Sequence, residues 1–507
     1  HAFVDLNGNR YVALGTDKFL LLYFEGQLFD ITPLKATLSS STIATTNASA
    51  VCTITTSTSH NLEPGDIVLL DSVTLPGGTG FSASDFEDKL FQVTAVPTPT
   101  TFTITQSSNA GATVSTGGTI NMSSVGGSGG FTLIGSEKND SLTGSGNNDI
   151  LEIKSTGAGD GDTLDGAGGT DTLKLSTGTH TLANDNFLKN IEELETNSSG
   201  STVVLTGQTE AFTITGGAGN DIITAGSGDD IITSGGGTDS LTGAAGTDTF
   251  KVTAGIVTIN DLINGDHFVV SNSANATANN VGNYTAQAAT SNAGTATINS
   301  ATGNTTIDMS GSTSGGFKIV GSAGVNQFTG GKGNDIITGA AGDDILVGGL
   351  GNDIITGGND NDTITGGAGN DTFNIDAGSD IINDLGGVGA ADEDDVLIVS
   401  NSATVNATNI IKFVATNASK NEGTANLTAK STGGHIDMTL STAGAYTITG
   451  SANTDTLIAG IGNDTIQITS AGDGNSDTMD GGSGTDTLKL AAGSNIFSDN
   501  NKLKNIE

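Results

Sequence analysis

The chain has 507 residues and a formal net charge of −38, because 55 acidic residues stand against 17 basic ones. A nucleic-acid partner needs the opposite sign, so the charge excludes that class of function. Cys52 is the only cysteine, which excludes an intrachain disulfide, and no run of eighteen apolar residues predicts a membrane span. Because surplus carboxylates repel one another unless cations are bound, we expect cations as partners.

Residues 1–120 carry the signals of short strands joined by turns. Apolar runs at Tyr11–Leu14 and Phe19–Phe24 are separated by turn residues, as in hairpins. Further strands are expected at Val51–Thr55, Asp66–Leu70, Leu90–Val96 and Thr101–Thr105. All five prolines precede residue 100, and the composition changes near residue 120. We therefore expect a β-sandwich or barrel over residues 1–120.

This N-terminal region resembles a module of tail-associated structural proteins of tailed bacteriophages. The residues that carry the resemblance are Asn9–Thr16, Asp30–Pro33, His60–Leu62, Gly65–Val68 and Thr101–Ile104. The resemblance implies a region that docks to a particle. A chance likeness between two β-rich modules is the alternative.

Four tracts of nine-residue units follow, each after an entry motif such as FTITG or YTITG. They are Gly135–Glu152 with Asp140 and Asp149, Gly216–Lys251 with four units, Gly330–Asn374 with five units, and Gly450–Gln467 with Asp455 and Asp464. In the five-unit tract, Asp occupies the sixth position of every unit and an apolar residue the eighth. A fixed apolar phase argues against the alternative of a flexible Gly/Asp-rich linker.

The spacing has a physical interpretation. Glycines at the first, second and fourth positions permit tight turns with positive φ, and one Asp on each turn gathers carboxylate and carbonyl oxygens. This oxygen-only ligand set suits Ca²⁺ rather than zinc or copper. A single unit has no core, but stacked units share one, so the pattern predicts a solenoid.

These units resemble the repeats-in-toxin (RTX) nonapeptide, G-G-x-G-x-D-x-U-x, of parallel β-rolls. The resemblance implies that two units make one turn and that calcium lies between the loops of units n and n+2. It implies the pairs Asp221 with Asp239, Asp230 with Asp248, Asp335 with Asp353, Asp344 with Asp362, and Asp353 with Asp371. Asp360 replaces a fourth-position glycine, so we expect it to strain its loop or add a ligand. The two-unit tracts lack part of the pattern, and calcium binding by Asp140, Asp149, Asp455 and Asp464 is left open; in the first tract we expect weak binding or none.

Longer repeats indicate growth by duplication. The segment 131–140 matches 446–455 and LKNIE at 188–192 recurs at 503–507, both at an offset of 315, while VSNSA at 270 and 399 recurs at an offset of 129. We expect further similar modules beyond residue 507. The Thr/Asn/Ser/Ala-rich stretches 175–211, 252–316 and 396–445 alternate polar and apolar residues, which favours further solenoid coils or small β-sandwiches over disorder.

Signals for other chemistry are weak. His267 beside Asp266 has two readings, a base with its orienting carboxylate or a solvated turn. The run Asp392–Asp395 is either another cation site or a solvated acidic turn. Lys332 is followed by Gly333 rather than by the Ser or Thr of a phosphate-binding loop, and an Asp-lined loop repels phosphate.

The sequence thus predicts an all-β chain, a parallel β-roll or β-solenoid array with an N-terminal β-sandwich or barrel. The expected domains are 1–120, 121–215, 216–316, 317–445 and 446–507. We expect a non-enzymatic, calcium-stabilised structural protein of an extracellular surface, either a phage tail or tail-fibre component or a bacterial S-layer subunit or secreted adhesin. A secreted RTX enzyme would need a catalytic domain outside these residues. Expected partners are calcium ions, other structural subunits in a homo-oligomer, filament or lattice, and a cell-surface receptor.

Overall fold

A computed structural model of the chain is all-β, and among the residues that it describes no helix occurs. It describes residues 141–144, 146–153, 163–182, 188–386, 394–469, 476–493, 497 and 502–507, and before residue 141 the strands alone. The chain divides into two compact units, His1–Ser176 with Asp185–Glu193, and Thr177–Asn184 with Leu194–Glu507. The predicted fold class is confirmed, whereas the predicted domain boundaries stay predictions.

The first unit begins with two antiparallel assemblies. One is a four-stranded sheet of β1 (Ala2–Val4), β2 (Arg10–Gly15), β3 (Leu20–Phe24) and β4 (Gln27–Asp30). The other is a closed barrel of β5 (Leu38–Thr45), β6 (Val51–Thr55), β7 (Ile67–Thr74), β8 (Lys89–Thr98), β9 (Thr101–Thr105) and β10 (Thr119–Val125). Of the two predicted architectures, the structure thus has a barrel. His60–Leu62, which carry part of the phage resemblance, lie outside the described residues.

The same unit also contains parallel strands. One set is β11 (Thr132–Ile134), β13 (Ile150–Ile153) and β15 (Thr172–Leu175), and the other is β12 (Ser141–Thr143), β14 (Thr163–Asp165) and β17 (Leu188–Lys189). Two of the strand pairs, β12 with β14 and β13 with β15, lie 22 residues apart in the sequence, for example Ile150 opposite Thr172. Strand β18 (Glu193–Glu195) spans the boundary between the two units.

The second unit is a parallel solenoid whose first half is built from two sheets. Sheet I contains β20 (Thr213–Thr215), β22 (Ile231–Thr233), β24 (Thr249–Val252), β26 (His267–Val270) and β29 (Ser291–Asn292). Sheet II contains β16 (Gly178–Thr181), β19 (Ser201–Val204), β21 (Ile222–Thr224), β23 (Thr238–Thr242), β25 (Ile256–Ile259), β27 (Asn275–Val281), β30 (Thr295–Ser300), β32 (Lys318–Val320), β34 (Ile336–Ala341), β36 (Ile354–Asn359), β38 (Thr372–Ile375), β40 (Val396–Val399) and β43 (Lys420–Asn421).

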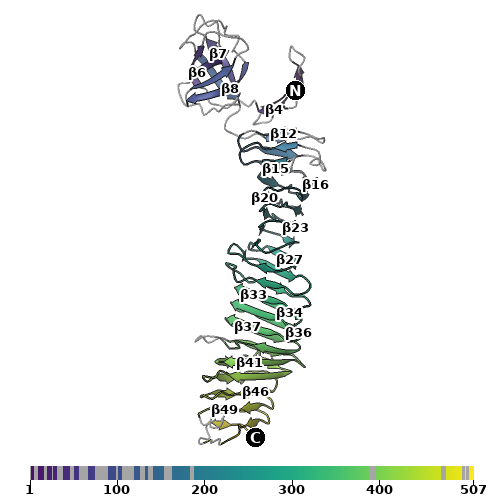
Figure 1. The fold of residues 1–507 in the computed structure, drawn as a ribbon, viewed down its shortest axis with the longest axis vertical. Helices are drawn as coiled ribbons and strands as arrows, with labels where there is room; N and C mark the ends of the chain where they lie inside the picture. Colours follow the sequence, from purple (N-terminus) through teal and green to yellow (C-terminus); the bar gives the residue numbers. More distant parts are fainter. Residues whose placement is uncertain are drawn as a thin grey trace. The chain divides into compact units, whose positions relative to one another are not determined.

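Two more sheets complete this unit. Sheet III contains β28 (Tyr284–Thr285), β31 (Thr306–Asp308), β33 (Gln327–Lys332), β35 (Ile345–Leu350), β37 (Thr363–Ala368), β39 (Ser379–Ile382), β41 (Thr404–Ile410), β44 (Thr424–Ala429), β46 (Tyr446–Thr449), β48 (Thr465–Gln467) and β50 (Thr487–Lys489). Sheet IV contains β42 (Lys412–Val414), β45 (His435–Asp437), β47 (Thr456–Ile458), β49 (Thr478–Asp480) and β51 (Leu503–Lys504). Figure 1 shows β27, β36, β41 and β49 following one another along the stack.

Nonapeptide tracts form turns of two units that share one apolar column. Ile336 pairs with Ile354, so successive turns lie 18 residues apart, as the resemblance implies. The eighth-position residues are fully buried, and they are Ile223, Ile232, Leu241 and Phe250 in one tract and Ile337, Leu346, Ile355, Ile364 and Phe373 in the other. Each such side chain contributes about 1.5–3 kcal/mol of burial free energy, so the predicted column is confirmed as the core of the tracts.

Three-sided coils separate the tracts. From β26 to β31 the chain visits sheets I, II and III in turn, twice, and then alternates between sheets II and III. From β40 to β45 it visits sheets II, III and IV in the same way, and then alternates between sheets III and IV. Of the two structures expected for 252–316 and 396–445, the described residues therefore form solenoid coils rather than β-sandwiches.

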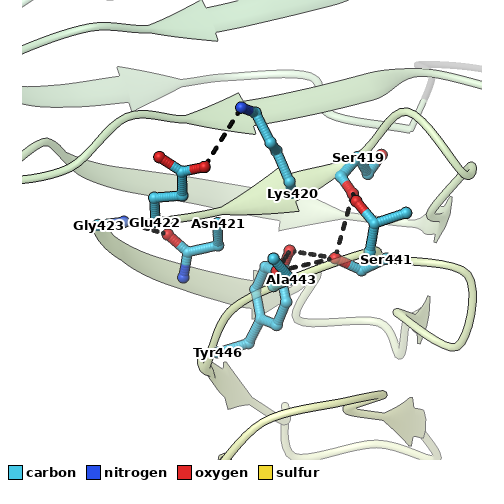
Figure 2. A network of polar contacts seen from close by, with 9 residues as sticks. Ser419, Lys420, Asn421, Glu422, Gly423, Ser441, Ala443 and Tyr446 are labelled. Carbon is cyan, nitrogen blue, oxygen red and sulfur yellow. Dashed lines mark hydrogen bonds and ion pairs between the residues drawn. The ribbon is translucent and has the colours of Figure 1, made fainter.

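Each three-sided coil buries a small cluster of neutral polar side chains joined by hydrogen bonds, although Ser312 Oγ in the first coil has no partner among the described residues. In the second coil the Tyr446 hydroxyl lies 2.6 Å from Ser441 Oγ, and Ser441 Oγ, with its single O–H proton, lies 3.3 Å from two acceptors, the Ser419 and Ala443 carbonyl oxygens (Figure 2). Asn421 Nδ2 donates to the Ala445 carbonyl at 2.5 Å. The cluster lies between consecutive coils, so it ties them together.

The first coil places its aromatic hydroxyl at a different position. Tyr284, at the position of Phe413 in the second coil, donates to the Asp266 carbonyl at 3.1 Å and lies 3.2 Å from Thr290 Oγ1. Phe317 stands where the second coil has Tyr446. The two coils thus share one fold but bury their tyrosine hydroxyl at different positions and with different hydrogen-bond partners.

We predict that Tyr446→Phe destabilises the second coil by about 0.5–1.5 kcal/mol, the net contribution of one buried hydrogen bond. Phenylalanine fits the backbone here because Phe317 occupies the equivalent place in the first coil. Native-state hydrogen exchange of peptides from 419–449 measures the loss, with peptides from 330–374 as the internal reference. Unchanged exchange in 419–449 would show that the hydroxyl contributes nothing.

Candidate metal-binding turns

The nine predicted ligand aspartates lie directly before the short strands of the two longer tracts or, for Asp239, at the start of β23, and all of them are buried. Their relative exposures are at most 2%, for Asp221, Asp230, Asp239, Asp248, Asp335, Asp344, Asp353, Asp362 and Asp371. Carboxylates are rarely buried unless they are paired or hydrogen-bonded. The placement therefore demands partners for both oxygens of each side chain.

One carboxylate oxygen is bonded to the neighbouring turn. Asp335 donates its backbone N–H to Asp353 Oδ1 at 2.7 Å, and Asp353 donates to Asp371 Oδ1 at 2.8 Å. The same bond, at 2.8–2.9 Å, joins Asp344 to Asp362, Asp221 to Asp239 and Asp230 to Asp248. The structure thus stacks the members of all five predicted pairs on adjacent turns, while ion binding by them stays a prediction.

The second oxygen, Oδ2, is the unusual one. Among the described residues it has no hydrogen-bond partner in Asp239, Asp248, Asp335, Asp344, Asp353 and Asp362. In Asp221 and Asp230 it accepts the N–H of Gly217 at 3.0 Å and of Gly226 at 3.3 Å. Six of the nine predicted ligands therefore hold a buried oxygen that only a proton, water or cation can satisfy.

In the five-unit tract, the first glycine of each unit provides space beside this oxygen. A Cβ on Gly330 would overlap Asp335 Oδ2 and come within 2.6 Å of the Gly348 carbonyl oxygen. Only the second and fourth positions are left-handed, with φ of +112° at Gly331 and +111° at Gly333. The prediction that the first glycine takes positive φ is wrong, because that glycine is required by the carboxylate next to it.

Asp360 occupies a left-handed fourth position, with φ of +74°. A non-glycine residue pays a steric cost there, so the expected strain in its loop is confirmed. Its Oδ2 accepts the N–H of Gly342 at 3.2 Å, which ties the loop to the preceding turn.

The bonds between sixth-position aspartates of successive turns form a ladder of hydrogen bonds. A second ladder, which the sequence interpretation missed, joins the fifth-position residues of successive turns. Asn352 donates its N–H to Asn334 Oδ1 at 2.8 Å, and Asn370 donates to Asn352 Oδ1 at 2.9 Å. These side chains reach toward the following turn, whereas the aspartates reach toward the preceding one. The recurrent Asn or Asp before the sixth-position Asp was the available signal.

Burial shifts the titration of the aspartate ladder. Loss of solvation raises the pKa of Asp335, Asp362 and Asp371 to about 7, and neighbouring carboxylates on adjacent turns add to the increase. The pKa of Asp353 rises to about 6, also through burial. The hydrogen bond from the preceding backbone N–H opposes the increase in each case.

The donor set fits a hard cation. Unpartnered carboxylate oxygens lie beside glycine carbonyl oxygens, and oxygen ligands are those that Ca²⁺ prefers. Within the described ranges, no three His, Cys, Asp or Glu side chains gather closely enough to hold a metal by themselves. An ion here would therefore be held by one or two carboxylates and by peptide carbonyls.

The ladders extend past the predicted ligands. The backbone N–H of Asp362 donates to Asp380 Oδ1, that of Asp371 to Asp395 Oδ1 and that of Asp248 to Asp266 Oδ1, each at 2.9 Å. The unit 375–383 keeps Asp at position six and an apolar residue at position eight, which was the signal for Asp380.

Two of the aspartates at ladder ends, Asp395 and Asp266, have both oxygens occupied, whereas Asp380 at another end has an Oδ2 without a partner among the described residues. Asp395 Oδ2 accepts the N–H of Gly386 at 2.7 Å, and Asp266 Oδ2 that of Ile263 at 2.9 Å. Neither reading of the Asp266–His267 pair holds, because Asp266 is buried in the ladder and His267 Nδ1 lies 3.2 Å from Thr249 Oγ1. Asp395 likewise is not a solvated acidic residue, while Asp392 and Glu393 lie outside the described residues.

The two-unit tracts also join ladders. Asp149 donates to Asp171 Oδ1 at 2.6 Å and Asp464 to Asp486 Oδ1 at 2.8 Å, although Asp140 lies outside the described residues. Asp171 and Asp486 belong to the units GAGGTDTLK at 166–174 and GGSGTDTLK at 481–489, whose spacing was the missed signal. Asp455 Oδ2, in contrast, accepts the Ser451 N–H at 2.7 Å.

We predict that, in excess chelator, the solenoid loses stability as pH rises from about 4 to about 7. The folded state holds protons on Asp335, Asp362 and Asp371 that the unfolded state has already released, so deprotonation favours unfolding over this window. In calcium the slope flattens, since a bound ion displaces the protons that the folded carboxylates would otherwise hold. Denaturant unfolding at several pH values, with and without calcium, measures both slopes. Parallel slopes would contradict a metal held by these side chains.

The family model described as RTX calcium-binding nonapeptide repeat (4 copies) matches residues 125–152, 213–259, 320–355, 347–382, 442–467 and 470–497. No curated protein matches the chain, and the N-terminal resemblance to phage tail proteins stays a prediction. The matched ranges include all nine predicted ligand aspartates. The chain therefore contains RTX calcium-binding nonapeptide repeats.

Proposed function

We propose that calcium ions bridge consecutive turns at the five stacked pairs and so stiffen the solenoid. The residues that would hold the ions are Asp221, Asp230, Asp239, Asp248, Asp335, Asp344, Asp353, Asp362 and Asp371, with peptide carbonyls of the glycine turns. The observation that carries this proposal is the buried, unpartnered Oδ2 that recurs along the tracts. A cation at these oxygens removes the cost of burying a charge and the repulsion between stacked carboxylates.

The size of the effect follows from mass action. Extracellular calcium modules bind with dissociation constants of roughly 0.1–1 mM, so about 10 mM calcium stabilises the fold by about 1.4–2.7 kcal/mol per site. Five such sites together are comparable with the whole stability of a small domain. Calcium would then decide whether the tracts fold, and the low calcium of a cytoplasm would leave them unfolded until export or release.

We further propose a non-enzymatic structural role outside a cytoplasm. The support is the repeated architecture, in which each turn mainly contacts its neighbours, together with a net charge that only bound cations balance. Among the residues that the structure describes, no helix is long and apolar enough to span a membrane.

Of the extracellular assemblies, a phage tail or tail fibre is the one we favour. The support is the N-terminal resemblance, together with a closed barrel, β5 to β10, that is built without nonapeptides and suits a docking domain. The alternative is an S-layer subunit or adhesin. Immunogold labelling with antibodies to the barrel separates the two, because label on virions supports the tail and label on the surface of uninfected cells supports the alternative.

We predict that calcium, but not magnesium, produces a cooperative gain of β signal and compaction near millimolar concentration. Magnesium keeps its water ligands and demands an octahedral geometry that peptide carbonyls do not supply. Circular dichroism and sedimentation velocity of the full chain, titrated with each metal from excess chelator, make the measurement. A chain that is equally folded in chelator would leave the apolar column as the sole support of the solenoid.

A further inference from the structure

The two LKNIE segments, 188–192 and 503–507, lie at the end of a stack of nonapeptide-like units without being nonapeptides themselves. Each follows a complete unit, 166–174 or 481–489, on the next turn of the solenoid. Neither the nonapeptide motif nor the 18-residue turn accounts for them. Their contacts with Asp171 and Asp486 assign them a role.

Asp171 has the same environment as the aspartates of the long tracts. It has no exposed surface, and its Oδ1 accepts the N–H of Asp149 at 2.6 Å. Its Oδ2 has no hydrogen-bond partner within the described part of the chain. Asp486 repeats this arrangement with Asp464 at 2.8 Å and with its own unpartnered Oδ2.

The recess beside this oxygen also matches that of the long tracts. A Cβ on Gly166 would overlap both Asp171 Oδ2 and the Asn190 carbonyl oxygen. A Cβ on Gly330 meets the equivalent pair, Asp335 Oδ2 and the Gly348 carbonyl. The carbonyl of Asn190 thus stands where the long tracts place the first-glycine carbonyl of the next turn.

The LKNIE residues hold this carbonyl in place. Asn190 adopts a left-handed φ of +49°, and its Nδ2 donates to Asp165 Oδ1 at 2.7 Å. Glu192 Oε2 accepts the Asp171 N–H at 2.8 Å, which is the bond that the next aspartate makes in a long tract.

The second copy holds its carbonyl in the same way. Asn505 has the same φ of +49° and the same 2.7 Å bond, to Asp480. A Cβ on Gly481 would overlap the Asn505 carbonyl oxygen and come within 2.7 Å of Asp486 Oδ2. The backbone N–H of Glu507 donates to the Asp486 carbonyl at 3.1 Å.

We propose that each LKNIE segment closes a terminal calcium site, formed by Asp171 Oδ2 with the Asn190 carbonyl in the first copy and by Asp486 Oδ2 with the Asn505 carbonyl in the second. The proposal rests on the calcium binding proposed above and extends it to ladders with 22-residue turns. The segment would then supply a carbonyl oxygen to the last aspartate of the ladder without adding another buried carboxylate.

The test compares three variants of the full chain by hydrogen–deuterium exchange in excess chelator and in 10 mM calcium. Gly166→Ala fills the recess at a φ that alanine tolerates, while Gly168→Ala is the matched control, since its Cβ meets nothing closer than 3.8 Å. Asp171→Asn keeps an oxygen that can accept the Asp149 N–H but removes the charge. The readout is the calcium-induced protection of peptides covering 163–182 and 188–193.

We expect calcium to slow exchange in these peptides at least tenfold in the wild type and in Gly168→Ala, and to have little effect in Gly166→Ala and Asp171→Asn. Asp171→Asn should keep the wild-type calcium protection of peptides from 216–251 and 330–374, which guards against a variant that simply unfolds. Equal calcium protection in Asp171→Asn and the wild type would overturn the proposal. If 163–193 does not respond while 216–251 and 330–374 do, only the LKNIE site is wrong. If no segment responds, the proposed calcium function itself fails.

Discussion

The tracts depend on a buried carboxylate that has one bonded oxygen and one unbonded oxygen. Asp353 shows the arrangement, because its Oδ1 accepts the Asp335 N–H while its Oδ2 lies beside Gly348 without a donor. The bonded oxygen fixes the register of adjacent turns, and the unbonded one creates a demand for a counterion. Stability and metal dependence therefore arise from the same side chain, and one cannot be altered without the other.

The three-sided coils solve the same packing problem with neutral groups. Where the tracts bury aspartate, the coils bury Asn292, Asn421, Thr290 and Ser441, which have partners in the protein. Neutral amides and hydroxyls carry no charge to be balanced. We therefore regard the solenoid as segments that bury carboxylates alternating with segments that bury neutral polar groups.

Much of the fold could be predicted from the sequence because the nonapeptide fixes residue type at each phase. The apolar eighth position, the 18-residue turn and the stacking of Asp335 on Asp353 all follow from that regularity. The prediction was poorer where the regularity lapses. Asp266 and Asp380 lack the leading glycines, and Asp171 lies on a turn of 22 residues. Their roles depend on which residue of the next turn lies opposite, and such long-range register is not written in any one unit.

The succession of sheets has a consequence for what the solenoid can display. Each three-sided coil ends one sheet and begins another, so the pair of sheets that flanks a tract advances from I and II to II and III, and then to III and IV. Duplicating a 129-residue module would lengthen the protein and, in the same step, turn the side on which its glycine loops emerge. In an array grown in this way, successive tracts are flanked by different pairs of sheets, so their glycine loops do not all follow the same edge of the solenoid.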